Sequence, residues 1–288
     1  MENNFLGINE ISFEKAKFII LPVPYEVSTS FIKGTSLAPS SIISVSEQLE
    51  FYDEQLKIEP YISGIKTLPL LSPALQSFEL MKKKIKKEVQ KIIEKDKFLI
   101  VIGGEHTISV GVVEAYKEKI PDLKILILDA HADLREKYQD TKYSHACVTR
   151  RIVEMGFEVY VIGVRSISKE EVEFIEREKK VKIFCAYQME ENWPEKIQKK
   201  IPEGKYYLSI DADFFDPSVI SEVGNPEPGG FGWKDTILFL EKFISRKDIE
   251  IIGFDFVELS PEKTPSVSSF ISAKLIYRII GLIEKYQK

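Results

Sequence analysis

The feature of this sequence that most constrains its fold is the alternation of short aliphatic runs with charged, amphipathic segments. The runs that predict buried strands cover 16–24, 97–104, 124–130, 157–164, 181–186, 205–213 and 249–259. Stretches with a helical pattern cover 79–95, 168–180, 190–200, 234–245 and 268–286. Strands that are apolar on both faces and are followed by helices indicate a parallel sheet that is covered on both sides.

The organisation of the chain favours one domain. Its 288 residues can bury a large core, and they contain no internal repeat, no low-complexity tract and no linker long enough to separate two domains. We therefore expect a single α/β domain over 1–288.

Composition excludes several classes of protein. Hydrophobic residues make up 44% and charged residues 30%, which is typical of a soluble globular protein. The net charge of −5 and the lack of a basic stripe argue against nucleic-acid binding. No apolar run approaches the ~20 residues of a membrane helix, and the start has no signal-peptide pattern. Two cysteines form no disulfide framework, so we expect reduced thiols in a cytoplasmic protein.

Polar residues follow four of the predicted strands. In open parallel sheets, ligands bind beyond the carboxyl ends of the strands. The residues at these ends are Glu105, His106, Asp129, His131, Asp133, Asp211, Asp213 and Glu258. The chain has only three histidines, and the third, His145, lies just downstream of 124–135. Because all three accompany carboxylates at one predicted rim, a shared chemical role is favoured over three incidental ones.

The type of these residues predicts a pair of metal ions. The six candidate ligands are His106, Asp129, His131, Asp133, Asp211 and Asp213. Six ligands, of which four are carboxylates, are too many for one tetrahedral zinc ion, and oxygen ligands with a minority of imidazole suit Mn²⁺. Bridging carboxylates can hold two ions about 3.5–4 Å apart, and such a pair lowers the pKa of a shared water. We therefore expect a hydrolase whose nucleophile is a metal-bound hydroxide.

Neighbouring residues have simpler interpretations. Asp216 in the DPS stretch indicates a turn, and Cys147 indicates a small core residue. Glu105 is a candidate partner for a metal ligand. The stretch EQLEFYD, 47–53, has no role that the sequence alone assigns.

Five ordered motifs resemble those of the ureohydrolase family, which includes arginases, agmatinases and formiminoglutamases. They are GGEHT, LDAHADLR, YSHAC, SIDADFFDPS and FVELSP, and the likeness extends from about Val23 to the C-terminal helix. The resemblance implies a three-layer α/β/α fold around a largely parallel eight-stranded sheet. It also implies two Mn²⁺ ions per chain and a homo-oligomer, either a trimer or a hexamer.

The resemblance assigns roles to individual residues. His106, Asp129, Asp133 and Asp211 would bind one manganese ion, and Asp129, His131, Asp211 and Asp213 the other. As catalytic residues, Asp133 would also orient the bridging hydroxide, His145 would transfer a proton, and Glu258 would grip the guanidinium group of the substrate. A carboxylate can hold the planar N–H fork of a guanidinium with two parallel hydrogen bonds. A histidine whose pKa is near neutrality can protonate the departing amine.

Within the family, the sequence is most similar to agmatinases. DLREKYQDTKYSHA has their compact form and lacks the polar stretch with which arginases hold the α-amino acid group, and NPEPGG also resembles agmatinases. We therefore expect a small cationic guanidine substrate, namely agmatine, converted to putrescine and urea. The alternatives are aminopropylagmatine, guanidinobutyrate or arginine. The loop KGTSLAPSSI, 33–42, lacks the Gly-Pro and Arg of many relatives, so it predicts nothing about substrate entry.

Two other classes of protein agree less well with this sequence. A deacetylase of related fold would use one zinc ion and a tandem histidine pair, and this chain has no such pair. A metal-binding scaffold without activity would have lost ligands, whereas all six candidates, His145 and Glu258 are present. Metal content combined with activity on guanidines separates the scaffold from the enzyme.

Overall fold

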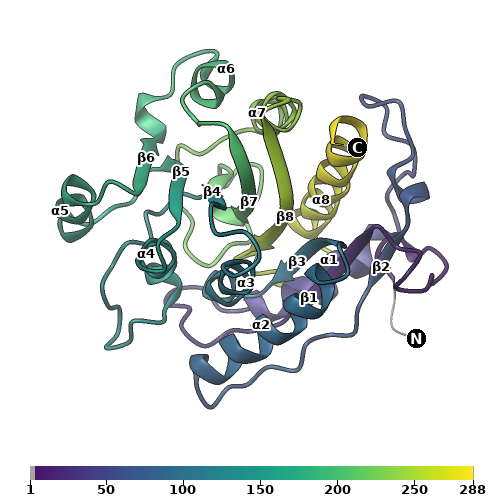
Figure 1. The fold of residues 1–288 in the computed structure, drawn as a ribbon, viewed down its shortest axis with the longest axis horizontal. Helices are drawn as coiled ribbons and strands as arrows, with labels where there is room; N and C mark the ends of the chain where they lie inside the picture. Colours follow the sequence, from purple (N-terminus) through teal and green to yellow (C-terminus); the bar gives the residue numbers. More distant parts are fainter. Residues whose placement is uncertain (1–3, 288) are drawn as a thin grey trace.

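The computed structural model describes residues 4–287 and is built around one eight-stranded sheet (Figure 1). The strands are β1 (Phe18–Val23), β2 (Ile65–Thr67), β3 (Phe98–Gly103), β4 (Lys124–Leu128), β5 (Glu158–Val164), β6 (Val181–Cys185), β7 (Gly204–Asp211) and β8 (Ile249–Val257). Their order across the sheet is β2-β1-β3-β8-β7-β4-β5-β6, and every neighbouring pair is parallel. The fold class expected from the sequence is therefore confirmed, with a sheet that is entirely parallel.

Helices cover both faces of the sheet. The helices are α1 (Ala38–Ser46), α2 (Phe78–Ile93), α3 (Ile108–Tyr116), α4 (Val148–Glu154), α5 (Lys169–Arg177), α6 (Trp193–Gln198), α7 (Trp233–Ile244) and α8 (Val267–Tyr286). One face packs against α1, α6, α7 and α8, and the other packs against α2, α3, α4 and α5 (Figure 1). Successive side chains of a strand point to opposite faces, so Ile100 joins the first of these cores and Val101 the second. This explains why the strands have no polar alternation.

The seven predicted strands and five predicted helices are confirmed, with ends that shift by up to three residues. The sequence reading missed β2, α1, α3 and α4. Strand β2 has only three residues, and α4 has only seven. Helix α3 is buried on nearly every side, from Ile108 to Tyr116, so it lacks the polar face by which a helix is recognised.

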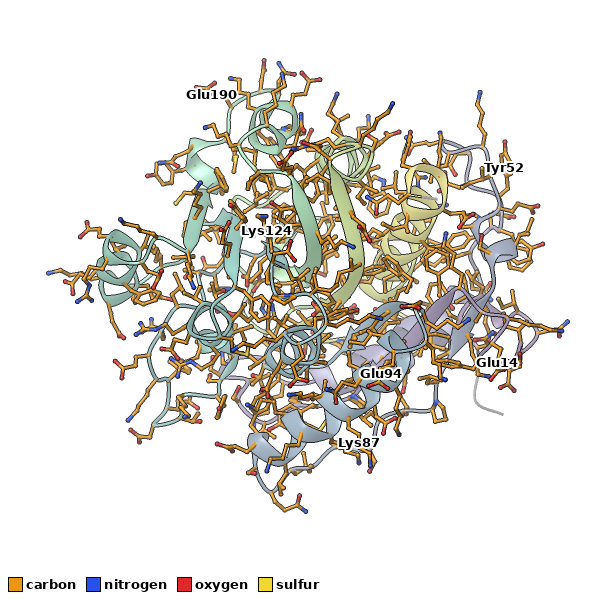
Figure 2. All side chains as sticks on the ribbon, in the orientation of Figure 1. Glu14, Tyr52, Lys87, Glu94, Lys124 and Glu190 are labelled. Atoms are coloured by element: carbon orange, nitrogen blue, oxygen red, sulfur yellow. The ribbon has the colours of Figure 1, made fainter. Side chains whose placement is uncertain are left out.

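The lysine-rich helix α2 has the amphipathic form that was predicted. Its buried side includes Met81, Ile85 and Val89, at intervals of four residues, and Ser77 caps its first turn by accepting a hydrogen bond from the backbone N–H of Leu80. The opposite side is solvated, and Figure 2 shows Lys87 there on the outside of the molecule.

A buried ion pair joins the last helix to a stretch near the start of the chain, after α1. Arg278 of α8 and Asp53 of the EQLEFYD stretch are both almost fully buried, and Arg278 Nε lies 2.5 Å from Asp53 Oδ2. Arg278 also donates to Gln55 Oε1 and, over 3.1 Å, to Glu54 Oε1. The other oxygen of Asp53 accepts hydrogen bonds from the backbone N–H groups of Gln55 and Leu56. The stretch that had no assigned role is therefore an anchor for the last helix.

Replacing Arg278 tests this anchor. Arg278→Ala leaves the carboxylate of Asp53 buried without its counter-charge, so we expect the free energy of unfolding to fall by about 3–5 kcal/mol. Urea unfolding followed by circular dichroism measures the change. Lys274→Ala is the matched control, because Lys274 lies one turn earlier and pairs with the exposed Glu54 at 3.6 Å. It should cost about 1 kcal/mol or less, and equal losses in both variants would contradict the assignment.

The structure also describes the two cysteines and the hydropathy of the helices. Cys147 and Cys185 are free thiols, and Cys147 is buried as predicted. Among the described residues, no helix combines the length and the hydropathy that crossing a bilayer requires.

Candidate metal centre

The candidate residues meet at the carboxyl ends of four adjacent strands in the middle of the sheet, β3, β8, β7 and β4. His106 follows β3, Glu258 follows β8, Asp211 ends β7, and Asp129 follows β4. These strands are far apart in the sequence, and only the parallel sheet brings their ends together. The predicted rim is therefore the arrangement that the structure has.

Three carboxylates surround one nitrogen of His106. His106 Nδ1 lies 3.3 Å from a carboxylate oxygen of each of Asp129, Asp133 and Asp211. All four side chains are buried. A nitrogen that faces three carboxylates, contributed by two segments of the chain, forms part of a site that could hold a cation.

A second group of ligands adjoins the first. His131 Nδ1 lies 2.9 Å from Asp213 Oδ2 and 3.7 Å from Asp129 Oδ1. Ligand atoms of Asp129, His131 and Asp213 lie within 4.8 Å of one another, and so do those of His106, Asp129 and Asp133. Asp129 is common to both groups, which is the position of a bridging ligand. The contact of Asp211 with His106 places Asp211 beside the first group.

The cluster contains buried atoms that a metal ion could satisfy. Among the described residues, His106 Nδ1 and Asp129 Oδ2 are buried atoms that have no hydrogen-bond partner, and both face the cluster. Buried polar atoms and buried carboxylates are costly unless they are paired or coordinate a metal. A cation between these atoms would satisfy them.

A second set of side chains fixes the orientation of His106. Its Nε2 lies 3.0 Å from Ser209 Oγ, and Ser209 donates to Asp255 Oδ1 over 2.6 Å. Asp255 is fully buried and also accepts a hydrogen bond from the Tyr207 hydroxyl. Such outer partners hold a ligand imidazole in one tautomer, here with the free Nδ1 toward the cluster. The sequence analysis missed Asp255, although a carboxylate inside the apolar run of 249–257 was a visible signal.

The backbone of the GGEHT motif passes close to another loop. The Gly104 N–H donates to the Val23 carbonyl, and the Glu105 N–H donates to the Tyr25 carbonyl. A Cβ atom on Gly104 would lie 2.0 Å from that Tyr25 carbonyl oxygen. Glycine is therefore required at 104, because only it lets the 24–37 loop lie against the site.

Two of the proposed catalytic residues have unusual backbone conformations. Asp133 has φ of 52° and Glu258 has φ of 62°, in the left-handed region that non-glycine residues rarely adopt. Glu258 is held there by its N–H, which donates to the Gly104 carbonyl, and by its Oε1, which accepts from the His106 N–H over 2.5 Å. Strained residues of this kind cluster at functional sites.

His145 lies at the edge of the cluster among polar side chains. Ser28 Oγ lies 3.3 Å from its Nδ1, and Ser30 Oγ lies 3.3 Å from its Nε2. Asn225 Nδ2, which belongs to the NPEPGG stretch, lies 3.4 Å from Nε2. Burial and the nearby His131 lower the pKa of His145 to about 4, so its imidazole is neutral near pH 7. The sequence analysis did not predict the contacts of the two serines and Asn225 with His145, because these residues are distant from His145 in the sequence and no motif links them to it.

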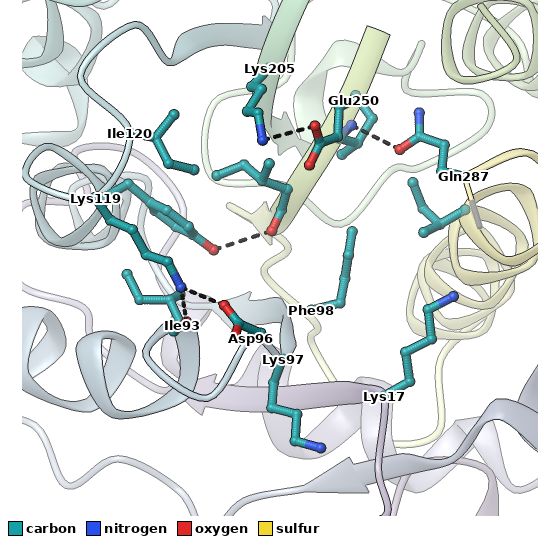
Figure 3. A pocket seen from close by; sticks show the side chains of 14 residues that line it. Lys17, Ile93, Asp96, Lys97, Phe98, Lys119, Ile120, Lys205, Glu250 and Gln287 are labelled. Carbon is teal, nitrogen blue, oxygen red and sulfur yellow. Dashed lines mark hydrogen bonds and ion pairs between the residues drawn. The ribbon is translucent and has the colours of Figure 1, made fainter. Parts of the chain in front are cut away.

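A cavity of about 350 Å³ opens at the opposite end of the sheet (Figure 3). Its walls include Phe98, Lys205 and Glu250, from the first residues of β3, β7 and β8. The lysines that line it are paired. Lys205 contacts Glu250 at 3.0 Å, Lys119 contacts Asp96 at 2.8 Å, Lys17 contacts Glu284 at 2.6 Å, and Lys97 donates to the Glu14 carbonyl. The unpaired ligand atoms His106 Nδ1 and Asp129 Oδ2 lie instead at the carboxyl end, which is the end where a cation could bind.

Comparison with known proteins agrees with this geometry. The model of the arginase family matches residues 16–281, which is nearly the whole chain. The chain belongs to the arginase family.

Relatives of this arginase-family protein cover almost its full length. The N(1)-aminopropylagmatine ureohydrolase of Synechocystis sp. is 37% identical over 279 residues, which span 94% of this chain and 90% of the relative. The agmatinase of Pyrococcus horikoshii is 33% identical over 277 residues, which span 94% of each chain. The crystal structure of the agmatine ureohydrolase of Thermoplasma volcanium superposes on this chain with a TM-score of 0.88 at 32% identity. The superposition covers 96% of this chain and 92% of the Thermoplasma chain.

Family membership establishes the class of reaction. The protein is a ureohydrolase, a hydrolase that acts on guanidino groups. The family depends on a binuclear metal centre, and this arginase-family chain has the two adjoining His and Asp clusters that such a centre needs.

Without metal, the ligand set holds protons. Burial would lower the pKa of His106, but Asp129, Asp133 and Asp211 outweigh it and keep that pKa well above its usual value. Burial would also lower the pKa of His131, but the carboxylates of Asp213 and Asp129 raise that pKa to about 12. Burial and the charge of Asp129 raise the pKa of Asp133 to about 7, and burial also raises that of Asp211. Metal ions must displace these protons, because only the deprotonated groups are ligands.

We therefore expect the affinity for Mn²⁺ to fall as the pH falls from about 8 to about 6, with protons released on binding. Titration calorimetry in buffers with different ionisation enthalpies counts the protons. Asp216→Asn is the control, because its carboxylate lies in a turn where hydrogen bonds with Ser218 lower its pKa to about 2. It is deprotonated throughout this range and contributes no proton. Metal binding without proton release would rule out these ligands.

Proposed function

We propose that this ureohydrolase catalyses the manganese-dependent hydrolysis of a linear guanidine that carries a distal amine, with N(1)-aminopropylagmatine as the favoured substrate and agmatine as the second. The reaction adds water to the guanidinium carbon, breaks the bond from that carbon to the substituted nitrogen, and yields urea and a protonated amine. The proposal depends on one observation: the six candidate ligands meet in two adjoining groups that share Asp129, and Glu258 accepts a hydrogen bond from the backbone of one of them.

The metal ligands are proposed as two sets that share members. His106, Asp129, Asp133 and Asp211 would hold one ion, and Asp129, His131, Asp211 and Asp213 would hold the other. The contacts of His106 with three carboxylates support the first set, and those of His131 with Asp213 and Asp129 support the second. Four carboxylates and two imidazoles are donors that suit Mn²⁺. When bound, a metal pair supplies an activated water as nucleophile, and Asp133 would orient that water.

Glu258 is the proposed group for binding the guanidinium. Its side chain is buried, and one carboxylate oxygen is fixed by the His106 N–H. Burial raises its pKa well above the usual value in the protein alone. A bound guanidinium would reverse this effect, because an opposite charge in contact favours the carboxylate. Glu258 would then place the guanidinium carbon beside the ligand cluster.

His145 is the proposed carrier of the proton that the amine takes as it leaves. Its imidazole lies between Ser28, Ser30 and Asn225 rather than among the metal ligands. A non-ligand histidine can gain and lose a proton during each turnover without releasing the metal.

Two observations support the choice of substrate. The sequence lacks the polar stretch expected for binding an α-amino acid group, which disfavours arginine. The Synechocystis relative and two Thermus thermophilus relatives are named N(1)-aminopropylagmatine ureohydrolase, whereas the Pyrococcus relative is named agmatinase. The longer substrate is therefore favoured over the agmatine that motifs alone suggested. We further propose that the protein acts in the cytoplasm as a homo-oligomer.

The substrate proposal is tested with manganese-loaded protein and urea release as the measurement. We expect kcat/KM to rank N(1)-aminopropylagmatine first and agmatine second, with guanidinobutyrate and arginine much lower. Faster release from arginine would overturn the substrate assignment. Two bound ions per chain without urea from any of the four guanidines would overturn the activity and favour a metal-binding scaffold.

The role of Glu258 is tested by Glu258→Gln. Loss of the charged hydrogen bond to the guanidinium, worth about 1.5–3 kcal/mol, should lower kcat/KM roughly 10- to 150-fold, while the metal content stays at the wild-type level. Steady-state kinetics and metal analysis give both quantities. Glu262→Gln is the control, because Glu262 is an exposed carboxylate four residues further along the chain. Unchanged kcat/KM in Glu258→Gln would show that another group binds the guanidinium.

A further inference from the structure

Glu105, the acidic residue of the GGEHT motif, has no place among the ligands, yet its side chain is fully buried. One of its oxygens, Oε2, accepts hydrogen bonds from the backbone N–H groups of Val27 and Ser28, each over 2.6 Å. The other, Oε1, accepts from Ser28 Oγ over 2.9 Å and from Thr107 Oγ1 over 2.6 Å. The carboxylate therefore fixes both the backbone and the hydroxyl of Ser28.

Ser28 in turn contacts His145 at two places. Its Oγ accepts a hydrogen bond from the backbone N–H of His145 over 2.9 Å, and it lies 3.3 Å from Nδ1 of the ring. A serine hydroxyl has one proton to donate. Because that proton goes to Glu105, Ser28 Oγ can interact with the ring only as an acceptor, and Nδ1 must be the donor.

The other side of the ring agrees with this assignment. Nε2 faces Asn225 Nδ2 at 3.4 Å, and an amide nitrogen is only a donor. Ser30 Oγ, which lies 3.3 Å from Nε2, donates its proton to Asn225 Oδ1 over 3.5 Å and so directs the Asn225 Nδ2 group toward the ring. The neutral imidazole therefore carries its proton on Nδ1 and has its lone pair on Nε2. Ser144 Oγ also lies 3.3 Å from Nδ1 and can accept in the same sense.

We propose that Glu105, acting through Ser28, is a positioning residue that fixes the orientation and the tautomer of His145, so that Nε2 is the atom that exchanges protons in the reaction. The inference rests on the proposed function. In each turnover Nε2 takes a proton from the attacking water and gives it to the departing amine, while the other proton remains on Nδ1 and is donated to Ser28 Oγ in a hydrogen bond. The imidazole thus begins and ends neutral.

The loop that carries Ser28 has independent support, which makes the serine replaceable. Glu26 holds the loop by accepting hydrogen bonds from the Gly34 N–H over 2.8 Å, from the Ser36 N–H over 3.0 Å and from Ser36 Oγ over 2.8 Å. The loop therefore keeps its fold when one hydroxyl at 28 is removed. Ser36→Ala is the matched control, because it removes a serine-to-carboxylate hydrogen bond in the same loop without touching His145.

The inference is tested by a double-mutant cycle on the manganese-loaded enzyme, with whichever of the four guanidines named above it hydrolyses fastest. General acid catalysis contributes about 10²–10⁴-fold, so His145→Ala should lower kcat at least about a hundredfold. Ser28→Ala should lower kcat about tenfold, with KM and metal content unchanged. In the His145→Ala background, Ser28→Ala should change kcat less than twofold, because residues that act through one group are not additive. Ser28→Thr, which keeps the hydroxyl, and Ser36→Ala should resemble the wild type.

Two outcomes would overturn the inference. One is wild-type kcat in Ser28→Ala, and the other is the same tenfold loss in both backgrounds, which indicates a purely structural role. If Ser28→Ala does not fold or loses metal, Ser28→Cys replaces it in the same cycle, with the same expected results. Failure of the proposed function is distinct, because the wild type itself would then release no urea from any guanidine.

Discussion

The buried cluster of carboxylates at the centre of the sheet is the constraint on which the rest of the structure depends. Asp129, Asp133, Asp211 and Asp213 are each at most 6% exposed, and such charges are stable together only when positive charge lies among them. His106 and His131 supply part of that charge when metal is absent, and a pair of dications would supply it during function. The strands that carry these residues are packed into apolar cores on both faces, so the ligands cannot relieve their repulsion by moving into water.

The parallel sheet solves the problem of assembling this cluster. Each ligand-bearing segment follows a strand whose side chains are buried on both faces, so the position of its carboxyl end is fixed by the core. The order β3-β8-β7-β4 places four such ends side by side. Outside the ligands, Ser209 contacts His106 and is held by Asp255, and Ser28 contacts His145 and is held by Glu105. Both pairs use a buried carboxylate and a serine hydroxyl to fix an imidazole.

The two sides of the site are built from different kinds of secondary structure. The ligands follow the central strands, whereas Ser28, Ser30 and Asn225 belong to loops held by carboxylates and backbone turns. The Glu26 carboxylate organises the 24–37 loop, and Asp216 accepts hydrogen bonds from the N–H groups of Gly229 and Gly230 in the NPEPGG stretch. Because loops tolerate change better than core strands, substrate range in such an enzyme can vary while the ligand cluster stays constant.

The sequence by itself determined a parallel α/β architecture, the end of the sheet that carries chemistry, and the identity of the candidate ligands. These follow from local patterns: two-sided apolar runs, and Asp and His residues directly after them. Only the tertiary structure decided which side chains meet. Helix α3 was hidden because complete burial removes the polar face of a helix, and Asp255 and the Asp53–Arg278 pair were hidden because their partners are distant in sequence. The hydrogen bonds that link Glu105 to Ser28 and Ser28 to His145 also join three separate segments, and no local pattern encodes a hydrogen bond between residues that only folding brings together.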